Sequence, residues 1–331
     1  VSGGATILVS KETALDAKRL AAVISTTQPQ VVQATPASWS SLLAIGWKPR
    51  DGMTVVTIGE ALSRSLASQL LDAGGKLYDL YGPTETTIWS TGCCKTNESH
   101  FKSIGRPMAN TQVYVLDSHR QPLPIGVSGE LYIGGAGLAR GYLNRPELTN
   151  ERFVPNPFSD DAHARLYRTG DLCRWRSDGN LEFLGRIDDQ VKLRGYRIEL
   201  GEVEAALLEH PNVAQCVVAL REDRPGDQRL VAYCVAHAQS GLNWLTLSNH
   251  LRGKLPDYMV PAAFVALDAL PLTSSGKINR RGLPVPDDSR PELESLYVPP
   301  QNAIENQLAS IWSEVLGVAS IGTHDNFFEL G

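Results

Sequence analysis

Short segments rich in glycine and polar residues are the parts of this sequence that could do chemistry. They combine lysine, arginine, carboxylate and hydroxyl side chains at a density that the packing of a hydrophobic core does not require. Any one of them alone could equally be a turn that carries a solvated charge. They lie at residues 79–87, 129–143, 167–172, 185–195, 255–261 and 275–280.

Several familiar catalytic motifs are absent from the sequence. Gly276-Lys277 is followed by isoleucine and residue 271 is proline, so the P-loop pattern GxxxxGK[ST] is not met. Residues 134–137 do not fit the dinucleotide pattern GxGxxG, and no GxSxG, HExxH or paired-cysteine zinc pattern occurs. The sequence therefore excludes the familiar hydrolases, dehydrogenases and P-loop enzymes.

Taken together and in this order, the six segments resemble the adenylation domains of nonribosomal peptide synthetases, within the adenylate-forming superfamily. The resemblance covers essentially the whole chain. It implies an adenylate-forming ligase that joins an amino-acid carboxylate to ATP, releases pyrophosphate and passes the acyl group to a phosphopantetheine thiol. The implied cofactors are ATP and Mg²⁺, with phosphopantetheine on a carrier domain. The implied partners are the amino acid, the carrier domain and neighbouring synthetase modules.

The resemblance makes Lys277 the catalytic residue, which would bridge the oxygens of the carboxylate and the α-phosphate. A compact cation on a glycine-hinged loop suits this role, because it can enter and leave the site between two half-reactions. Asp188 matches the hinge around which a small subdomain would rotate after adenylation. The alternative for Asp188 is an ordinary turn residue.

The nucleotide site follows from the same resemblance. Asp171 would bind the ribose hydroxyls and Arg186 would assist it, while Tyr81 would pack on the adenine with Phe183 as a second wall. Asp79 departs from the family, which usually has asparagine there for the adenine amino group. An aspartate can accept that hydrogen bond but cannot donate one. Turn capping at Asp171 and core packing at the two aromatic residues are the structural alternatives.

Two further residues would act on the phosphates. By resemblance, Thr84 would contact the α-phosphate and Glu85 would be the ligand of the magnesium ion. One carboxylate suits Mg²⁺, which binds to one or two carboxylates plus phosphate oxygens.

The acyl pocket is carried over position by position. Large side chains would leave little volume, which favours a small substrate such as glycine. Most of the set resembles glycine-activating domains, but those usually carry glycine where this chain has Ile58. The alternative is that some of these residues are sheet core. The predicted lining is Gln33, Val56, Ile58, Leu80, Ile88 and Trp89.

The elements that must position these residues follow from hydrophobic periodicity. Strand-like runs at 5–9, 31–34 and 53–58 alternate with helical runs at 14–24 and 62–71, which is the rhythm of a parallel α/β sheet. Strand-rich sequence follows over 112–184. Strands near 191–199, 213–221, 228–237 and 263–267, with helices at 202–209 and 245–255, predict a small α+β subdomain.

These patterns and the resemblance together imply four parts of the chain. Residues 1–187 form the C-terminal part of the large adenylation subdomain, with its parallel sheet and β-subdomain. Residues 188–285 form the small mobile subdomain, and prolines make 286–300 a stiff linker. Residues 301–331 resemble the start of a helical carrier domain.

The last predicted helix has an apolar face with nothing left in the chain to cover it. Asn302 and Glu305 are spaced as in a capping box before it. The apolar residues at helical spacing are Ile304, Leu308, Ile311, Trp312 and Val315.

Composition excludes other classes of protein. With 42% hydrophobic and 20% charged residues, the 331-residue chain is globular, with about two domains expected. Net charge is -5, and residues 286–331 hold eight acidic residues against one basic residue, so no basic face for nucleic acid is expected. No apolar run is long enough for a membrane span. The five cysteines form no CxxC pair, which favours reduced thiols and a cytoplasmic protein.

The resemblance also implies what the ends lack. The phosphate loop and the aspartate that holds the substrate amino group are expected before residue 1, and the phosphopantetheine serine just after Gly331. Two alternatives stay open: an acyl- or aryl-CoA ligase of the same superfamily, and a non-catalytic docking or scaffold fragment.

Overall fold

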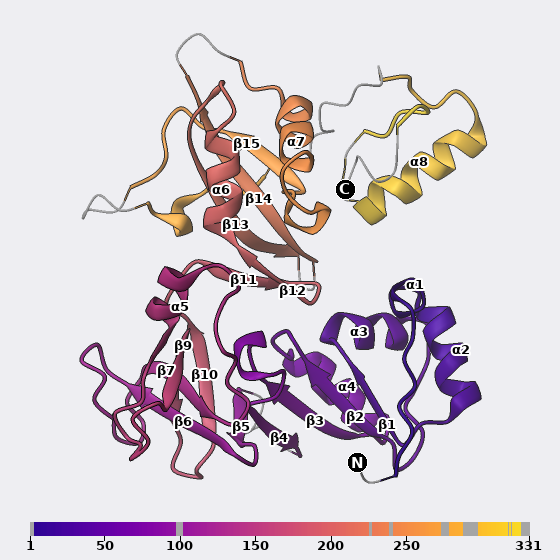
Figure 1. Ribbon diagram of the computed structural model, residues 1–331. Helices are drawn as coiled ribbons and strands as arrows, with labels where there is room; N and C mark the ends of the chain where they lie inside the picture. Colours follow the sequence, from indigo (N-terminus) through magenta and orange to yellow (C-terminus); the bar gives the residue numbers. More distant parts are fainter. Residues whose placement is uncertain are drawn as a thin grey trace. The chain divides into compact units, whose positions relative to one another are not determined.

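The computed structural model describes residues 3–96, 102–224, 227–237, 241–272, 278–286, 297–316, 318 and 320–325. The chain forms two compact units, Val1–Asp188 and Asp189–Gly331 (Figure 1). The first unit combines a large sheet with helices and the second is a smaller α+β unit, so the predicted fold class is confirmed.

The first unit is built on a ten-stranded sheet. Its strands lie in the order β1-β2-β3-β4-β5-β10-β9-β7-β6, and β8 pairs with β9. The first three are parallel, as the alternation of strand-like and helical runs predicts, and the other pairs are antiparallel. The strands are β1 Val31–Ala34, β2 Thr54–Ile58, β3 Lys76–Tyr81, β4 Thr91–Lys95, β5 Ser103–Pro107, β6 Thr111–Leu116, β7 Gly129–Gly135, β8 Phe153–Pro155, β9 Arg165–Trp175 and β10 Leu181–Arg186.

The helices of this unit begin where a side chain can satisfy the first free N–H groups. Asp16, Thr35 and Ser63 each accept a hydrogen bond from a backbone N–H of the helix that follows. Apolar residues of these helices, including fully buried Trp39, form one core with Val55 of β2. The helices are α1 Lys11–Leu15, α2 Ala17–Thr27, α3 Pro36–Ala44, α4 Arg64–Asp72 and α5 Pro146–Arg152.

Two predictions for the first residues of the chain need correction. The strand expected at 5–9 is wrong, because these residues are not strand and pair with no described strand. Leu8 is 89% exposed, so this apolar run is not part of the core. The helix expected at 14–24 is divided, since Asp16 ends α1 and caps α2.

The second unit begins with a hairpin and continues as a small three-stranded sheet. Strands β11 Gln190–Leu193 and β12 Tyr196–Glu199 are joined by Arg194 and Gly195, both in the left-handed conformation of a tight hairpin turn. Strands β13 Val213–Arg224, β14 Asp227–Ala236 and β15 Ala263–Ala266 form the sheet, and helices α6 Leu200–Leu208 and α7 Trp244–Arg252 pack on one face.

The predicted capped helix is present as α8, Ala303–Leu316. Asn302 Oδ1 accepts a hydrogen bond from Glu305 N at 2.9 Å, and the Glu305 carboxylate accepts one from Gln301 N at 2.7 Å. Trp312 packs on Val318 and Ile321. The other four apolar residues are exposed by 48% to 72%, as predicted: Ile304, Leu308, Ile311 and Val315.

Candidate active site

Neighbouring strands β9 and β10 bring Asp171 and Arg186 together. The two residues are register partners, so their side chains lie on the same face of the sheet, and Arg186 Nη1 lies 2.8 Å from Asp171 Oδ1. Tyr81, the last residue of β3, donates its hydroxyl to Asp171 Oδ2. The carboxylate is buried, and both of its oxygens are held by groups from different strands.

Arg186 also binds the residue predicted to be the hinge. Its Nε and Nη2 atoms lie 2.5 and 2.7 Å from the carboxylate oxygens of Asp188, and Nη2 donates to the carbonyl of Thr169. Gly170 makes this arrangement possible. It has φ +75°, and a Cβ atom there would lie 2.6 Å from Asp188 Oδ2 and 2.8 Å from Arg186 Nη2. One guanidinium therefore joins Asp171 to Asp188, and a side chain at position 170 would strain the backbone and displace one of these two groups.

A second polar cluster surrounds Glu85. This residue lies in the short 3-10 helix η1, Thr84–Thr86, and is 9% exposed. Its Oε1 atom accepts hydrogen bonds from the hydroxyls of Tyr142, at 2.5 Å, and Tyr167, at 2.8 Å. Burial first, and then the bond to Glu85, raise the pKa of Tyr142 far above its ordinary range, so this phenol stays protonated and keeps donating.

Two hydrogen bonds fix η1 and the residue that follows it on the segment 136–143. Ala139 N donates to the carbonyl of Glu85 at 2.8 Å, and Thr87 Oγ1 donates to the carbonyl of Gly137 at 2.7 Å. Thr84 is exposed at the start of η1. Two of the segments singled out by sequence, 79–87 and 129–143, are thus in direct contact.

The turn after η1 has an unusual backbone. Thr87 and Ile88 have φ values of +59° and +70°. A branched isoleucine rarely adopts this conformation, which costs about 1–3 kcal/mol. The surrounding bonds hold the turn: Ser90 N donates to the carbonyl of Tyr81 at 2.8 Å. Such strain is typical of sites that must present a side chain in one direction.

Tyr81 and Phe183 belong to one hydrophobic cluster of the first unit. Tyr81 is 8% exposed and Phe183 is half-buried on β10, and both pack with Leu131 and Leu181. Burial, followed by the charge of Asp171, raises the pKa of Tyr81 well above its ordinary value. Both residues thus have a packing role here, and their contact with adenine stays a prediction.

Asp79 is held by the two strands beside it. Its Oδ1 accepts a hydrogen bond from Thr57 Oγ1 of β2 at 2.8 Å, and its Oδ2 lies 3.1 Å from Lys95 Nζ of β4. Asp79 and Tyr81 are two residues apart along β3, so their side chains lie on the same face of the sheet.

The six predicted pocket residues fall into two groups. Gln33 pairs with Val56 and Ile58 pairs with Leu80, so these four side chains lie on one face of β1–β3, opposite the face covered by helices. The other two are in the turn after η1: Ile88 is 58% exposed and Trp89 is 46% exposed. Leu80 lies over Gly92, where a Cβ would be 2.5 Å from its Cδ2 atom.

Lys277, the predicted catalytic residue, lies outside the described residues. The chain on either side of 273–277 is joined by an antiparallel bridge between Leu272 and Ile278, and Asn279 N donates to the carbonyl of Pro271. These contacts belong to the second unit, whereas the Asp171 and Glu85 clusters belong to the first.

The donor set around Glu85 fits the expected magnesium ion. Among the described residues no group of three or more His, Cys, Asp or Glu side chains could hold a metal by itself. A single carboxylate is nevertheless what Mg²⁺ uses when phosphate oxygens and water complete its shell. Glu85 is a carboxylate of this kind, and Tyr142 and Tyr167 orient it.

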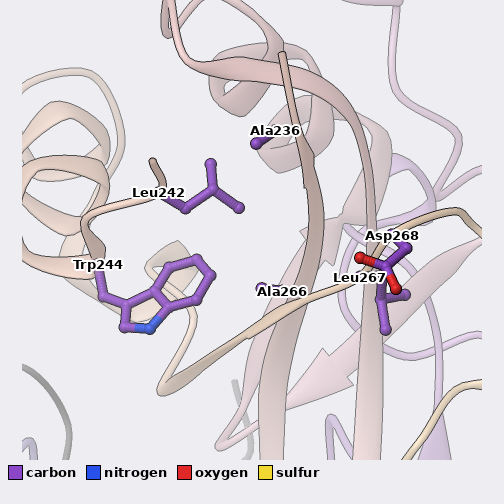
Figure 2. Close-up of a pocket in the computed structure, with 6 residues that line it drawn as sticks. All are labelled: Ala236, Leu242, Trp244, Ala266, Leu267 and Asp268. Carbon is purple, nitrogen blue, oxygen red and sulfur yellow. The ribbon is translucent and has the colours of Figure 1, made fainter. Parts of the chain in front are cut away.

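A hollow of about 380 Å³ opens in the second unit, at the ends of β14 and β15 and the start of α7 (Figure 2). Five of the six residues that line it are apolar by type, and none of the residues predicted for chemistry contributes to it. We therefore place the candidate site in the polar clusters of the first unit. The hollow is lined by Ala236, Leu242, Trp244, Ala266, Leu267 and Asp268.

Sequence reasoning missed four residues of the site. Tyr142 and Tyr167 lie within segments already singled out, but nothing in the pattern connects them to Glu85. Thr57 and Lys95, which hold Asp79, lie outside these segments. A charged residue inside a strand-like run gives the one available signal: Asp79 interrupts such a run, and a buried acid needs a partner.

Comparison with known families gives two matches. The family of AMP-binding enzymes matches residues 1–143, and its C-terminal domain family, the AMP-binding enzyme C-terminal domain, matches residues 202–277. Together they account for about two thirds of the chain. Residues beyond 277 are matched by neither.

Curated proteins that resemble the chain include peptide synthetases. A dimodular nonribosomal peptide synthase of Bacillus subtilis (strain 168) is 47% identical over 332 residues, which cover 100% of this chain and 14% of that protein. Malpibaldin synthetase of Mortierella alpina is 48% identical over 342 residues, 100% of this chain and 6% of that protein. The chain therefore spans a small part of these relatives.

Solved structures agree with these matches. A four-domain nonribosomal peptide synthetase bound to AMP and glycine is 42% identical, with a TM-score of 0.52 over 97% of this chain and 24% of that one. A synthetase protein with adenylation and carrier domains is 30% identical, with a TM-score of 0.74 over 96% of this chain and 52% of that one.

Within the described part of the sequence, none of the helices has the length and apolar character needed to span a bilayer.

Proposed function

Because the chain belongs to the AMP-binding enzymes, as an adenylation domain of the nonribosomal peptide synthetase type, we propose that it activates an amino acid with ATP. The products of this step are an aminoacyl adenylate and pyrophosphate. The observation that carries the proposal is the buried carboxylate of Asp171, whose two oxygens are held by Arg186 and Tyr81. A fixed carboxylate of this kind suits a pair of ribose hydroxyls, which are hydrogen-bond donors.

We assign the remaining residues to the adenine, the α-phosphate and the magnesium ion. Asp79 accepts from the adenine amino group, and Tyr81 with Phe183 gives the base an aromatic surface. The exposed hydroxyl of Thr84 donates to the α-phosphate. Glu85 is the protein ligand of Mg²⁺, and the bound ion reduces the charge repulsion among the phosphates.

Lys277 supplies the cation where the two anions meet. The substrate carboxylate must approach an α-phosphate that already carries negative charge, and an ammonium group stabilises the charge that develops between them. Asp188 is the hinge around which the small subdomain rotates between the two half-reactions. The shared contact of Asp188 and Asp171 with Arg186 supports a site that lies close to the hinge.

The acyl pocket accepts a small amino acid such as glycine. The support is the set of large side chains on one sheet face and in the turn after η1, and the glycine bound in the 42% identical synthetase. Transfer to the phosphopantetheine thiol of a carrier domain follows, with neighbouring synthetase modules as partners, as in the relatives that contain both domains. The cytoplasm, which holds ATP and reduced thiols, is the proposed location.

ATP–pyrophosphate exchange across a panel of amino acids tests this function. The assay uses the 331-residue chain and the same chain with any sequence that flanks it in the native polypeptide. We expect exchange to be greatest with glycine or another small amino acid. Lys277→Ala should lower the rate by about 10²–10³ while ATP binding persists, because the cation acts mainly in the transition state. Asp171→Ala should instead weaken ATP binding.

The outcomes separate the possible errors. Exchange with a bulky amino acid would retain the enzyme and discard the pocket assignment. If folded protein shows no ATP–pyrophosphate exchange with any amino acid, a docking or scaffold role would be favoured. An unchanged rate in Lys277→Ala would remove this lysine from the mechanism.

A further inference from the structure

A lysine is buried inside the sheet of the first unit. Lys95 is 1% exposed and its side chain is fully buried, which is rare for lysine unless a partner neutralises it. Its Nζ atom lies 3.1 Å from Asp79 Oδ2 and donates to the carbonyl of Ser103 at 2.6 Å. Lys95 is therefore the buried cation of an ion pair with a residue predicted to read adenine.

Strand register explains how the pair forms. Asp79 of β3 lies opposite Cys93 of β4, and Lys95 is two residues further along β4, on the same face. On the other side, Thr57 of β2 is the register partner of Asp79 and donates its hydroxyl to Oδ1. An ammonium from one neighbouring strand and a hydroxyl from the other thus fix the orientation of one carboxylate.

The two ends of the ion pair differ in access. The side chain of Lys95 is 0% exposed, whereas that of Asp79 is 12% exposed. A ligand at this place can therefore meet the carboxylate and not the ammonium. Lys95 can influence such a ligand only through Asp79.

The charge of Asp79 decides what it can recognise. A carboxylate only accepts hydrogen bonds, while an asparagine amide can turn and either accept or donate. Adenine carries an amino donor at its 6-position, where guanine carries a carbonyl acceptor. A fixed carboxylate matches the first and repels the second.

We propose that Lys95 is a positioning residue for nucleotide selection, which pairs with the Asp79 carboxylate and orients it so that the site binds ATP in preference to GTP. This inference rests on the proposed function, because it requires that Asp79 faces the base. It explains why this chain has aspartate at position 79, where the family usually has asparagine. The aspartate brings a strict acceptor, and the buried lysine makes its charge tolerable in the sheet.

The test compares nucleotide affinities of the wild-type chain and the double variant Asp79→Asn/Lys95→Met. The double variant replaces the ion pair by a neutral pair of similar size and leaves no unpaired buried charge, unlike either single variant. Titration calorimetry gives the ATP and GTP dissociation constants. We expect the wild-type preference for ATP to fall by about 10–100-fold in the double variant, because a hydrogen bond to a charged group is replaced by one to a rotatable amide.

A matched control removes another ion pair from the same sheet. Arg174 and Glu182 pair at 2.8 Å between β9 and β10, and neither residue is assigned to the nucleotide. The variant Arg174→Met/Glu182→Gln should keep the wild-type ratio of ATP to GTP affinity. A merely structural role of Lys95 would make the two double variants behave alike.

A second measurement needs no variant. Wild-type protein is titrated with ATP, with purine riboside triphosphate, which has no group at the 6-position, and with inosine triphosphate, which has a carbonyl there. An acceptor-only site should bind them in this decreasing order. Equal affinities would overturn the proposal whether or not the double variant folds.

The outcomes distinguish this inference from the function on which it rests. Wild-type protein that binds neither ATP nor GTP would overturn the proposed function itself. ATP binding with no preference over GTP would overturn the selectivity proposal, and so would a preference that persists in the folded double variant. A preference lost in that variant and kept in the control would establish the role of Lys95.

Discussion

Removal of the Arg186 guanidinium is the most severe test of the site geometry. In Arg186→Ala, the buried carboxylate of Asp171 would lose its cation, while Tyr81 would still donate to it. Asp188 would lose two contacts, and the carbonyl of Thr169 would lose one. We expect a large loss of stability in the first unit, because one charge is removed and its buried partner remains.

The magnitude follows from burial. The side chains of Arg186 and Asp171 are 12% and 7% exposed, and breaking a buried ion pair by deleting one partner costs about 3–5 kcal/mol. The lower end applies here, since Tyr81 still holds Asp171 and Asp188 is 29% exposed and can be hydrated. With a urea dependence of roughly 3 kcal/mol per molar for a unit of this size, a loss of about 3 kcal/mol lowers the midpoint by about 1 M.

Hydrogen exchange with mass spectrometry at increasing urea measures this midpoint for each unit separately. Peptides from β9 and β10 report on the first unit, and peptides from β13 and β14 report on the second. Arg176→Ala is the matched control, because Arg176 and Asp178 pair at 3.2 Å with side chains 28% and 36% exposed. An exposed pair contributes about 0–1 kcal/mol, so its midpoint should change little. A shift in Arg186→Ala no larger than in Arg176→Ala would refute the reasoning.

Two further substitutions probe the two units. Gly170→Ala should destabilise the first unit by about 1–3 kcal/mol, because φ is +75° and the new methyl group would collide with Arg186. Gly46→Ala isolates the backbone cost, since Gly46 has φ +80° and open space around it. Equal denaturation midpoints of the two variants would contradict the predicted collision. Burial, and secondarily the charge of His250, lowers the pKa of His210 below its ordinary 6.5. The unfolded chain therefore takes up the proton first as pH falls through about 6.5, so the second unit should lose stability there, and His210→Asn should flatten this dependence in pH-resolved urea denaturation. The same slope in wild type and variant would assign the pH dependence to other groups.

Periodicity predicted most of the elements because their apolar faces are buried within each unit. The parallel strands β1 and β2 and the helices α4 and α6 all lie within a few residues of their predicted positions. Helix α8, whose apolar residues are mostly exposed, was predictable instead from its helical spacing and its capping box. The run at 5–9 shows the limit of this reasoning. Its composition suits a strand, but a strand requires a hydrogen-bonded neighbour, and no described strand pairs with it.

The candidate site was predictable as a set of segments and less so as a set of contacts. The link between Asp171 and Arg186 depends on the register of β9 and β10, which includes an irregularity between Phe183 and Gly185. The link between Glu85 and Tyr167 joins residues 82 positions apart. Neither distance follows from spacing along the chain, because each is set by strand pairing and loop packing.

The guanidinium of Arg186 also has a thermodynamic consequence. It donates through Nη1 to Asp171 and through Nε and Nη2 to Asp188, so the two anions share one cation. A group bound at Asp171 that draws the guanidinium closer loosens its hold on Asp188, and a change at Asp188 alters the binding free energy at Asp171 by the same amount. The two carboxylates are thus linked energetically and reciprocally through a single side chain.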